Sequence, residues 1–171
     1  MGGTLTVTSP RGGPTVLVAQ LPVTTTAATA PAAPTALSEQ LERKTAMLIL
    51  DAGAFVAVER GDRDVVALIK RERLAGRAPL THGGVIAQIW RGGAHRQASV
   101  ARLLNGVEVV PLDLVLGREA GVLLAASGTS DAINSAVVCL AADGDDILTS
   151  DVSDLRELAQ AADLHVELIR V

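Results

Sequence analysis

Three aspartates are the residues of this chain that could carry out chemistry together. Asp51 lies at the end of a continuous apolar run that begins at Met47, and small and apolar residues follow it. A run that is apolar on both faces is typical of a central parallel strand, and ligands gather at the carboxyl ends of such strands. Asp151 follows a second short strand pattern at 146–149, and Asp131 opens the helical segment before it. We expect the three carboxylates to converge on one edge of one sheet.

Convergent carboxylates are typical ligands of a hard divalent cation. Mg²⁺ prefers oxygen ligands in octahedral geometry and keeps several waters, so a few carboxylates and phosphate oxygens suffice to hold it. A bound ion of this kind activates a water and neutralises charge on a scissile phosphate. Asp51, Asp131 and Asp151 are therefore the candidate catalytic residues and ligands, directly or through water, of Mg²⁺ or Mn²⁺.

Each aspartate also has a purely structural explanation. Asp131 follows Thr129 and Ser130, so it could simply cap a helix and interact with the helix dipole. Asp151 could likewise begin a helix near residue 154. The structural explanation is weaker for Asp51, because a strand-end acid between apolar neighbours has few local amides that could satisfy it.

The elements that must position these acids alternate along the chain. We predict strands at 47–51, 78–81, 107–111, 147–149 and 166–171, and helices at 53–59, 62–74, 85–90, 94–104, 114–126, 131–142 and 154–161. Such alternation indicates an α/β fold with a parallel sheet and helices on both faces.

The first 46 residues differ from the rest of the chain. They hold five of the seven prolines, few charges and no sustained hydrophobic period. We predict a disordered or weakly ordered leader over 1–46 and one domain over 47–171. A secretory signal is the alternative, since residues 15–19 form an apolar run. Gln20 and Pro22 interrupt this run, however, and Arg11 is the one positive residue before it.

Composition limits the class of protein. With 171 residues and 49% hydrophobic content the chain can build one core, and no stretch is long enough to span a membrane. The single Cys139 excludes an internal disulfide framework, so a reducing, cytoplasmic location is expected. Phe55 and Trp90 are the only aromatic residues. Trp90 is expected in the core, and stacking on bases is not expected.

Four segments together resemble a known family. They are LILDAGAF (48–55), VIAQIWR (85–91), TSDAINSA (129–136) and LTSDVSDL (148–155). In this order they resemble the PIN domain, and specifically the VapC-type toxins of bacterial toxin-antitoxin pairs, over residues 47–171. The resemblance implies a three-layer fold with a central parallel sheet and a metal-dependent ribonuclease site. It also implies a homodimer, a small antitoxin that masks the site, and a structured RNA substrate.

The chain departs from the family pattern in two places. Gln88 stands where such toxins usually carry a Glu after the second strand, and the later acid corresponds either to Asp131 or to the position of Asn134. Asp131 and Asn134 share a helix face, so either alignment directs one acid and one amide to the same region. We expect Gln88 and Asn134 to orient water or phosphate and Asp154 to be an outer-shell acid. Gln88 could equally be an ordinary surface residue.

The charge of the chain argues against general nucleic-acid binding. The formal net charge is −4, whereas general binders are strongly basic. Positive residues nevertheless concentrate between the first and third strands, where they could form a rim that holds RNA or could simply be solvated. They are Lys70, Arg71, Arg73, Arg77, Arg91, Arg96 and Arg102.

Three functions remain open from the sequence. The first is an active ribonuclease toxin, and the second is a catalytically weakened PIN-domain protein that keeps antitoxin or RNA binding. The third, an unrelated acidic phosphatase or phosphoacceptor domain, is disfavoured. Gly53 occupies the place of the second Asp that one phosphatase class needs. Phosphoacceptor domains need a Lys late in the chain, and Lys70 is the only Lys after Met47. We expect His82 in a loop and Cys139 in the packing of a helix.

Overall fold

The computed structural model describes residues 4–8, 16–20, 46–92 and 97–171, and the chain divides into two compact units, 1–35 and 36–171. In the first unit, β1 (Thr4–Thr8) pairs antiparallel with β2 (Val16–Gln20), with Thr4 opposite Gln20. The sequence analysis did not predict these strands. An isolated two-stranded hairpin is marginally stable in water.

Removing residues 1–46 should leave the melting temperature of the remaining domain nearly unchanged. The reason is that this segment lacks the hydrophobic period needed to join a packed core. Thermal melts of the full chain and of residues 47–171 measure the difference. A large drop for the shorter chain would show that the domain boundary is placed wrongly.

The second unit is built on one five-stranded parallel sheet. Its strands are β3 (Leu48–Leu50), β4 (Leu80–His82), β5 (Glu108–Val110), β6 (Asp146–Thr149) and β7 (Glu167–Arg170). The order across the sheet is β5-β4-β3-β6-β7, and every neighbouring pair is parallel. The five strands predicted after residue 46 are thus confirmed, and the strand that leads to Asp51 is the central one.

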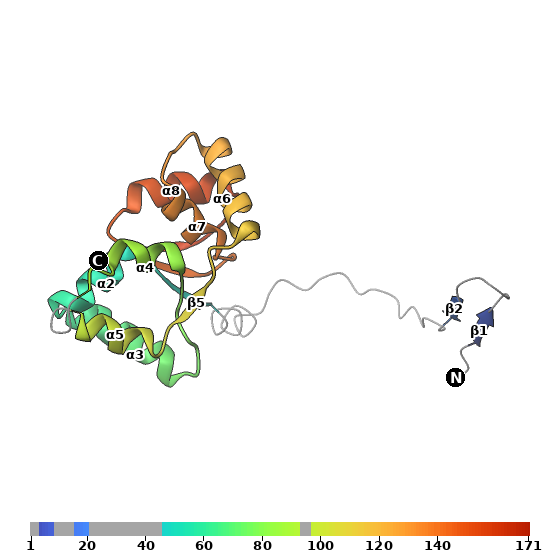
Figure 1. The fold of residues 1–171 in the computed structure, drawn as a ribbon, viewed down its shortest axis with the longest axis horizontal. Helices are drawn as coiled ribbons and strands as arrows, with labels where there is room; N and C mark the ends of the chain where they lie inside the picture. The colour runs from blue at the N-terminus through green and yellow to red at the C-terminus, as the bar shows by residue number, and fades with distance from the viewer. Residues whose placement is uncertain (1–3, 9–15, 21–45, 93–96) are drawn as a thin grey trace, which may run out of the picture. The chain divides into compact units, whose positions relative to one another are not determined.

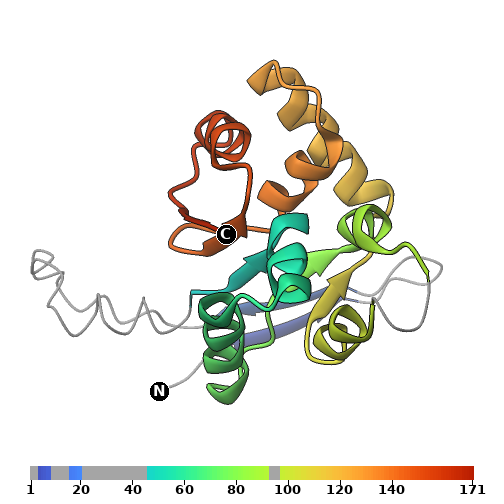
Figure 2. The same cartoon turned by 90° about the vertical axis from the view of Figure 1, so that its left-hand side faces the viewer.

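Seven helices in the described part of this unit cover the sheet. They are α2 (Ala52–Arg60), α3 (Arg63–Leu74), α4 (Gly83–Ile89), α5 (Ala98–Leu104), α6 (Leu114–Ser127), α7 (Ala132–Cys139) and α8 (Val152–Ala161). Helix α2 packs on α3 and α5, whereas α6, α7 and α8 pack on one another (Figures 1 and 2). The predicted three-layer α/β architecture is confirmed.

Among the described residues, no single helix is long and apolar enough to cross a membrane. Only α6 and α7 taken together have that length and composition, and they are bent by 109° at their junction.

The core fixes where the strands end. Ile49, Leu50, Phe55 and Leu148 are fully buried, and Leu50 lies opposite Leu148 in the sheet. Asp51 therefore leaves the sheet directly beside the end of β6, and its N–H donates to the Leu148 carbonyl at 3.1 Å. The two segments are close enough here that a Cβ at position 53 would lie 2.5 Å from the Ser150 nitrogen, so the chain needs Gly53 at this point.

Candidate active site

Each of the three candidate acids is the N-cap of a helix. Asp51 is the N-cap of α2, Asp131 of α7 and Asp151 of α8. Each carboxylate therefore lies at the positive end of a helix dipole.

Asp51 is the most enclosed of the three acids, with 4% of its surface exposed. Its Oδ1 accepts from the Ala52 N–H, and its Oδ2 accepts from the Thr149 hydroxyl at 2.8 Å. Burial nevertheless raises the pKa of Asp51, and the negative charges of Asp131 and Asp151 raise it further against these two hydrogen bonds. Asp131 and Asp151 are therefore each close enough to Asp51 to interact with its charge, and their joint role in one site stays a prediction.

The capping role proposed for Asp131 and Asp151 is confirmed, but it occupies only one oxygen of each. Oδ1 of Asp131 accepts from the backbone N–H groups of residues 133 and 134 at 2.8 and 2.9 Å. Oδ1 of Asp151 accepts from the Ser153 hydroxyl at 3.2 Å and from the Asp154 N–H at 3.4 Å. Oδ2 of Asp131 accepts no hydrogen bond from the described residues, whereas the side chain of Asp151 also interacts with that of Asp154.

Negative charge at this edge has no counter-charge within the described residues. No Lys or Arg among them forms an ion pair with Asp51, Asp131, Asp151 or Asp154. The pKa of the exposed Asp154 is raised, chiefly by the charge of Asp151. Uncompensated carboxylates of this kind attract a cation.

The donor chemistry fits a hard divalent ion that keeps part of its water shell. Carboxylate oxygens are the preferred ligands of Mg²⁺ and Mn²⁺, and Oδ2 of Asp131 accepts no hydrogen bond from the described residues. Within the described ranges, however, no group of three or more His, Cys, Asp or Glu side chains is arranged to hold an ion by itself. Ligation through water would therefore have to complete the site.

Gln88 and Asn134, the two amides that depart from the family pattern, have different surroundings. Asn134 is 6% exposed, lies one turn after Asp131 on α7, and its carboxamide makes no hydrogen bond to any described residue. Gln88 is exposed on α4, and its side chain makes no hydrogen bond to the candidate acids. A role for Asn134 beside the acids is therefore better supported than one for Gln88, which stays a prediction.

Thr149 is the residue that the sequence analysis missed. It is fully buried at the end of β6; its hydroxyl donates to Asp51 Oδ2 and accepts from the Asp151 N–H at 2.9 Å. One side chain thus connects two of the acids. Its position two residues before Asp151, pointing to the same side of the extended chain, was the available signal.

Thr149→Val should destabilise the protein by about 1–3 kcal/mol, because it leaves two buried groups without their partner. It should also raise the pKa of Asp51 further, since a hydrogen bond to the ionised form is lost. Thr81→Val is the matched control, because Thr81 is equally buried and donates at 2.8 Å to the Leu50 carbonyl instead. If the free energy of unfolding of the two variants depended on pH in the same way under acid conditions, this role would be contradicted.

Two further predictions from the sequence are corrected. His82 was expected in a loop, but it is the last residue of β4 and fully buried; its Nδ1 accepts from the Gly84 N–H and its Nε2 donates to the Ile133 carbonyl. Burial lowers the pKa of His82, so the neutral ring joins α4 to α7 as a structural element. Trp90 was expected in the core, but it is 46% exposed. Cys139 packs against the core as predicted.

Of the seven cations that could form a basic rim, Arg71, Arg73 and Arg77 do not lie beside the acids. Arg71 is close enough to Asp146, the first residue of β6, to lower the pKa of that acid, and Arg73 lies against Gly106, just before β5. Arg77 pairs at 2.6 Å with Glu72. These cations lie near the amino ends of parallel strands, which is the edge opposite Asp51.

The remaining cations of that prediction divide into two sets. Lys70 and Arg102 line a groove between α3 and α5, away from the acids. Arg91 follows α4, and Arg96 lies outside the described residues.

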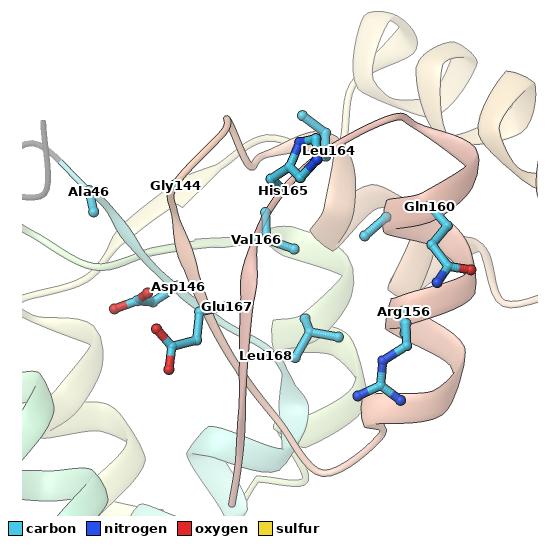
Figure 3. Close-up of a pocket in the computed structure, with 11 residues that line it drawn as sticks. Ala46, Gly144, Asp146, Arg156, Gln160, Leu164, His165, Val166, Glu167 and Leu168 are labelled. Carbon is cyan, nitrogen blue, oxygen red and sulfur yellow. The ribbon is translucent and has the colours of Figure 1, made fainter. Parts of the chain in front are cut away.

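A cavity of about 810 Å³ lies beside β7 and α8 but does not include the acids. Figure 3 shows the carboxylates of Asp146 and Glu167 side by side and Arg156 across the cavity on α8. Asp146 and Glu167 open their strands, so this cavity is at the amino edge of the sheet. Burial and Glu167 raise the pKa of Asp146.

Comparisons with known proteins agree with this architecture. No protein-family model matches the sequence. No curated protein sequence matches it either. Among solved structures, a chain of VapBC2 from Rickettsia felis, crystallised bound to a DNA fragment from their promoter, superposes with a TM-score of 0.55. It is 12% identical, and the match covers 71% of this chain and 98% of that chain. The fold is PIN-like, and the resemblance to VapC-type proteins is confirmed at the level of the fold.

Proposed function

We propose that this protein is a metal-dependent ribonuclease that acts as the toxin of a type II toxin-antitoxin pair. The observation that carries the proposal is that the charges of Asp131 and Asp151 both act on Asp51 at the carboxyl edge of a PIN-like sheet. No cation among the described residues forms an ion pair with these acids. The structural likeness to VapBC2 supports the same class of protein.

The residues divide the work as follows. Asp51, Asp131 and Asp151 would hold Mg²⁺ or Mn²⁺, directly or through water, and the bound ion would activate a water and neutralise phosphate charge. Thr149 keeps Asp51 oriented and lowers the pKa of its carboxyl group, so that it stays available as a ligand. Asn134 offers a free carboxamide to a water or phosphate oxygen.

Toxicity in a bacterial host tests the biological half of this proposal. Expression of the chain alone should arrest growth, and co-expression of the neighbouring gene should restore it. Asp51→Asn is the matched control and should not arrest growth. Normal growth with soluble, folded parent protein would contradict the toxin assignment.

A partner surface suited to an antitoxin lies between α3 and α5. This α3–α5 groove has a volume of about 560 Å³ and is lined by the apolar side chains of Val66, Ile69, Leu74 and Leu103. Val66 and Leu74 are 42% and 79% exposed. Three cations border the groove, namely Lys70, Arg73 and Arg102. Apolar lining with a basic border complements an antitoxin segment that carries apolar anchors and acids.

Val66→Asp should weaken capture of the product of the neighbouring gene by about tenfold or more, because it places a carboxylate in the apolar contact. Val122→Asp on α6 is the control, since Val122 is also exposed, at 72%, and lies outside the groove. Co-purification and titration of the two variants measure the change. Equal capture by both variants would exclude the groove.

The homodimer implied by the family resemblance is also part of the proposal. Exposed apolar side chains gather where β5 leads into α6, at Leu112, Leu114 and Val115, with 42%, 68% and 63% of their surfaces exposed. Contiguous exposed apolar residues favour self-association. Analytical ultracentrifugation of the parent and of Leu114→Asp would detect its loss.

A catalytically weakened PIN-domain protein is the second candidate. Asn134 and Gln88 supply neutral oxygens where acids are expected, and the described residues hold no group able to bind a metal by itself. Such a protein would bind RNA or antitoxin without efficient cleavage. Metal-dependent cleavage by the parent distinguishes the two candidates.

A further inference from the structure

Trp90 is an exposed aromatic side chain in a chain that has almost none. The sequence holds one Trp, one Phe and no Tyr, and Phe55 is fully buried. Trp90 stands at the end of α4 with 46% of its surface exposed. Base stacking was not expected because aromatic residues are so few, but the one tryptophan of the chain is exposed and accessible to a base.

Arg91, the next residue, is exposed and is hydrogen-bonded to the end of α4. Its Nη1 donates to the carbonyls of Ala87 at 3.2 Å and Trp90 at 3.3 Å, which caps the end of α4. The remaining guanidinium N–H groups donate to no described residue. A planar cation with free donors beside an aromatic ring suits a phosphate adjacent to a stacked base.

The turn that carries this pair is also tied down. Gln97 is 6% exposed; its Nε2 donates to the Ile89 carbonyl at 2.8 Å, and its Oε1 accepts from the Gly92 N–H at 3.2 Å. The backbone on both sides of Trp90 and Arg91 is therefore connected through one buried side chain. A pre-ordered contact loses less conformational entropy when a ligand binds.

Charge along the chain favours an anionic ligand here. No Asp or Glu occurs between Glu72 and Glu108, although acids outnumber bases in the whole chain. Helix α4 starts after His82, which is close enough to Asp51 to interact with its charge. At 1.5 Å per residue, the seven residues of α4 extend about 10 Å from that edge.

We propose that Trp90 and Arg91 bind single-stranded RNA next to the acid site, Trp90 by stacking on a base and Arg91 by binding the adjacent phosphate. The inference rests on the proposed ribonuclease function and names how its substrate is held. A second copy of this chain is the other possible occupant. It fits less well, because the exposed residues near Trp90 in sequence are Ala87, Gln88 and Arg91, which offer no large apolar area.

The test uses the fluorescence of Trp90, which is the only tryptophan of the protein. The full chain is titrated with a short single-stranded oligoadenylate in the presence of a chelator, so that no cleavage occurs. We expect quenching that saturates, and no quenching by an abasic ribose-phosphate chain of the same length. Quenching that is equal for both chains would overturn the stacking contact.

Two variants of Trp90 and one control variant complete the test, with affinity measured from the anisotropy of a labelled oligoadenylate. Trp90→Ala should weaken binding by about 5- to 100-fold, the range for loss of one stacked base, and Trp90→Phe should recover part of it. Val122→Ala on α6 should leave the affinity unchanged. Unchanged affinity of Trp90→Ala overturns the inference, as does a blue-shifted emission that depends on protein concentration and not on RNA, which would assign Trp90 to self-association.

The inference and the proposed function fail separately. Quenching and weakened binding without any metal-dependent cleavage would support RNA binding by Trp90 and Arg91 and reject the ribonuclease. Cleavage by a parent protein whose Trp90→Ala variant binds equally well would support the ribonuclease and reject this binding contact.

Discussion

Asp51→Asn should give a folded protein whose metal-dependent RNA cleavage falls by about 100-fold or more, because a charged oxygen ligand is lost. The fold should survive, since the asparagine carbonyl can accept from the Ala52 N–H while its amide donates to Thr149. The Thr149 hydroxyl can reverse its role because a hydroxyl both donates and accepts. Circular dichroism and a cleavage time course measure the two effects.

The pH dependence of stability predicts whether Asp51→Asn melts above or below the parent. Burial and the neighbouring acids raise the folded pKa of Asp51 above its unfolded value. As pH rises past the unfolded value, the unfolded chain ionises first, so the metal-free parent loses stability until the folded pKa is passed. Asparagine does not ionise and avoids this loss. The variant should therefore melt at or above the parent near neutral pH, and the difference should vanish in acid; a much lower melting temperature would make Asp51 structural.

Asn134→Asp should have the opposite effect on the site, raising Mg²⁺ affinity by about tenfold or more through an added anionic oxygen. The carboxamide of Asn134 makes no hydrogen bond to the described residues, so the substitution removes none there. In the absence of metal, repulsion from Asp131 should lower the free energy of unfolding by about 1–3 kcal/mol. Mg²⁺ should restore that loss because it binds the native state.

Calorimetric titration of Mg²⁺ into the parent and Asn134→Asp measures the gain. Gln88→Glu is the companion variant, because Gln88 is exposed and has no recorded contact with the acids. A gain in both variants would place both amides at the site, and a gain in Asn134→Asp alone would leave Gln88 outside it. Equal affinity of parent and Asn134→Asp would exclude Asn134 from metal binding.

The layout of the fold could be predicted because local patterns and global topology agree in this chain. Alternation of apolar runs and amphipathic segments after residue 46 corresponds to the observed strands and helices, with small shifts at the ends such as the close of α7 at Cys139. Asp51 and Asp151 follow strands of one parallel sheet, so their proximity follows from topology alone.

Features that depend on packing across the sheet could not be predicted in this way. The side of a helix that Trp90 occupies, and the sheet edge that Arg71 and Arg73 approach, depend on how α3, α4 and α5 pack, which spacing along the chain does not specify. The bond from Thr149 to Asp51 joins residues 98 apart in sequence. The β1–β2 hairpin was missed because proline-rich composition masked two short alternating segments.

Cleavage of RNA by the purified full chain tests the central claim most directly. Total bacterial RNA is incubated with the parent protein in Mg²⁺, in Mn²⁺ and in chelator, with Asp51→Asn as the control for contaminating nucleases. We predict discrete cleavage products with either metal, none in chelator and none from the variant. Intact RNA in Mg²⁺ and Mn²⁺ with folded parent protein, or equal cleavage in chelator, would contradict a metal-dependent ribonuclease built on Asp51, Asp131 and Asp151.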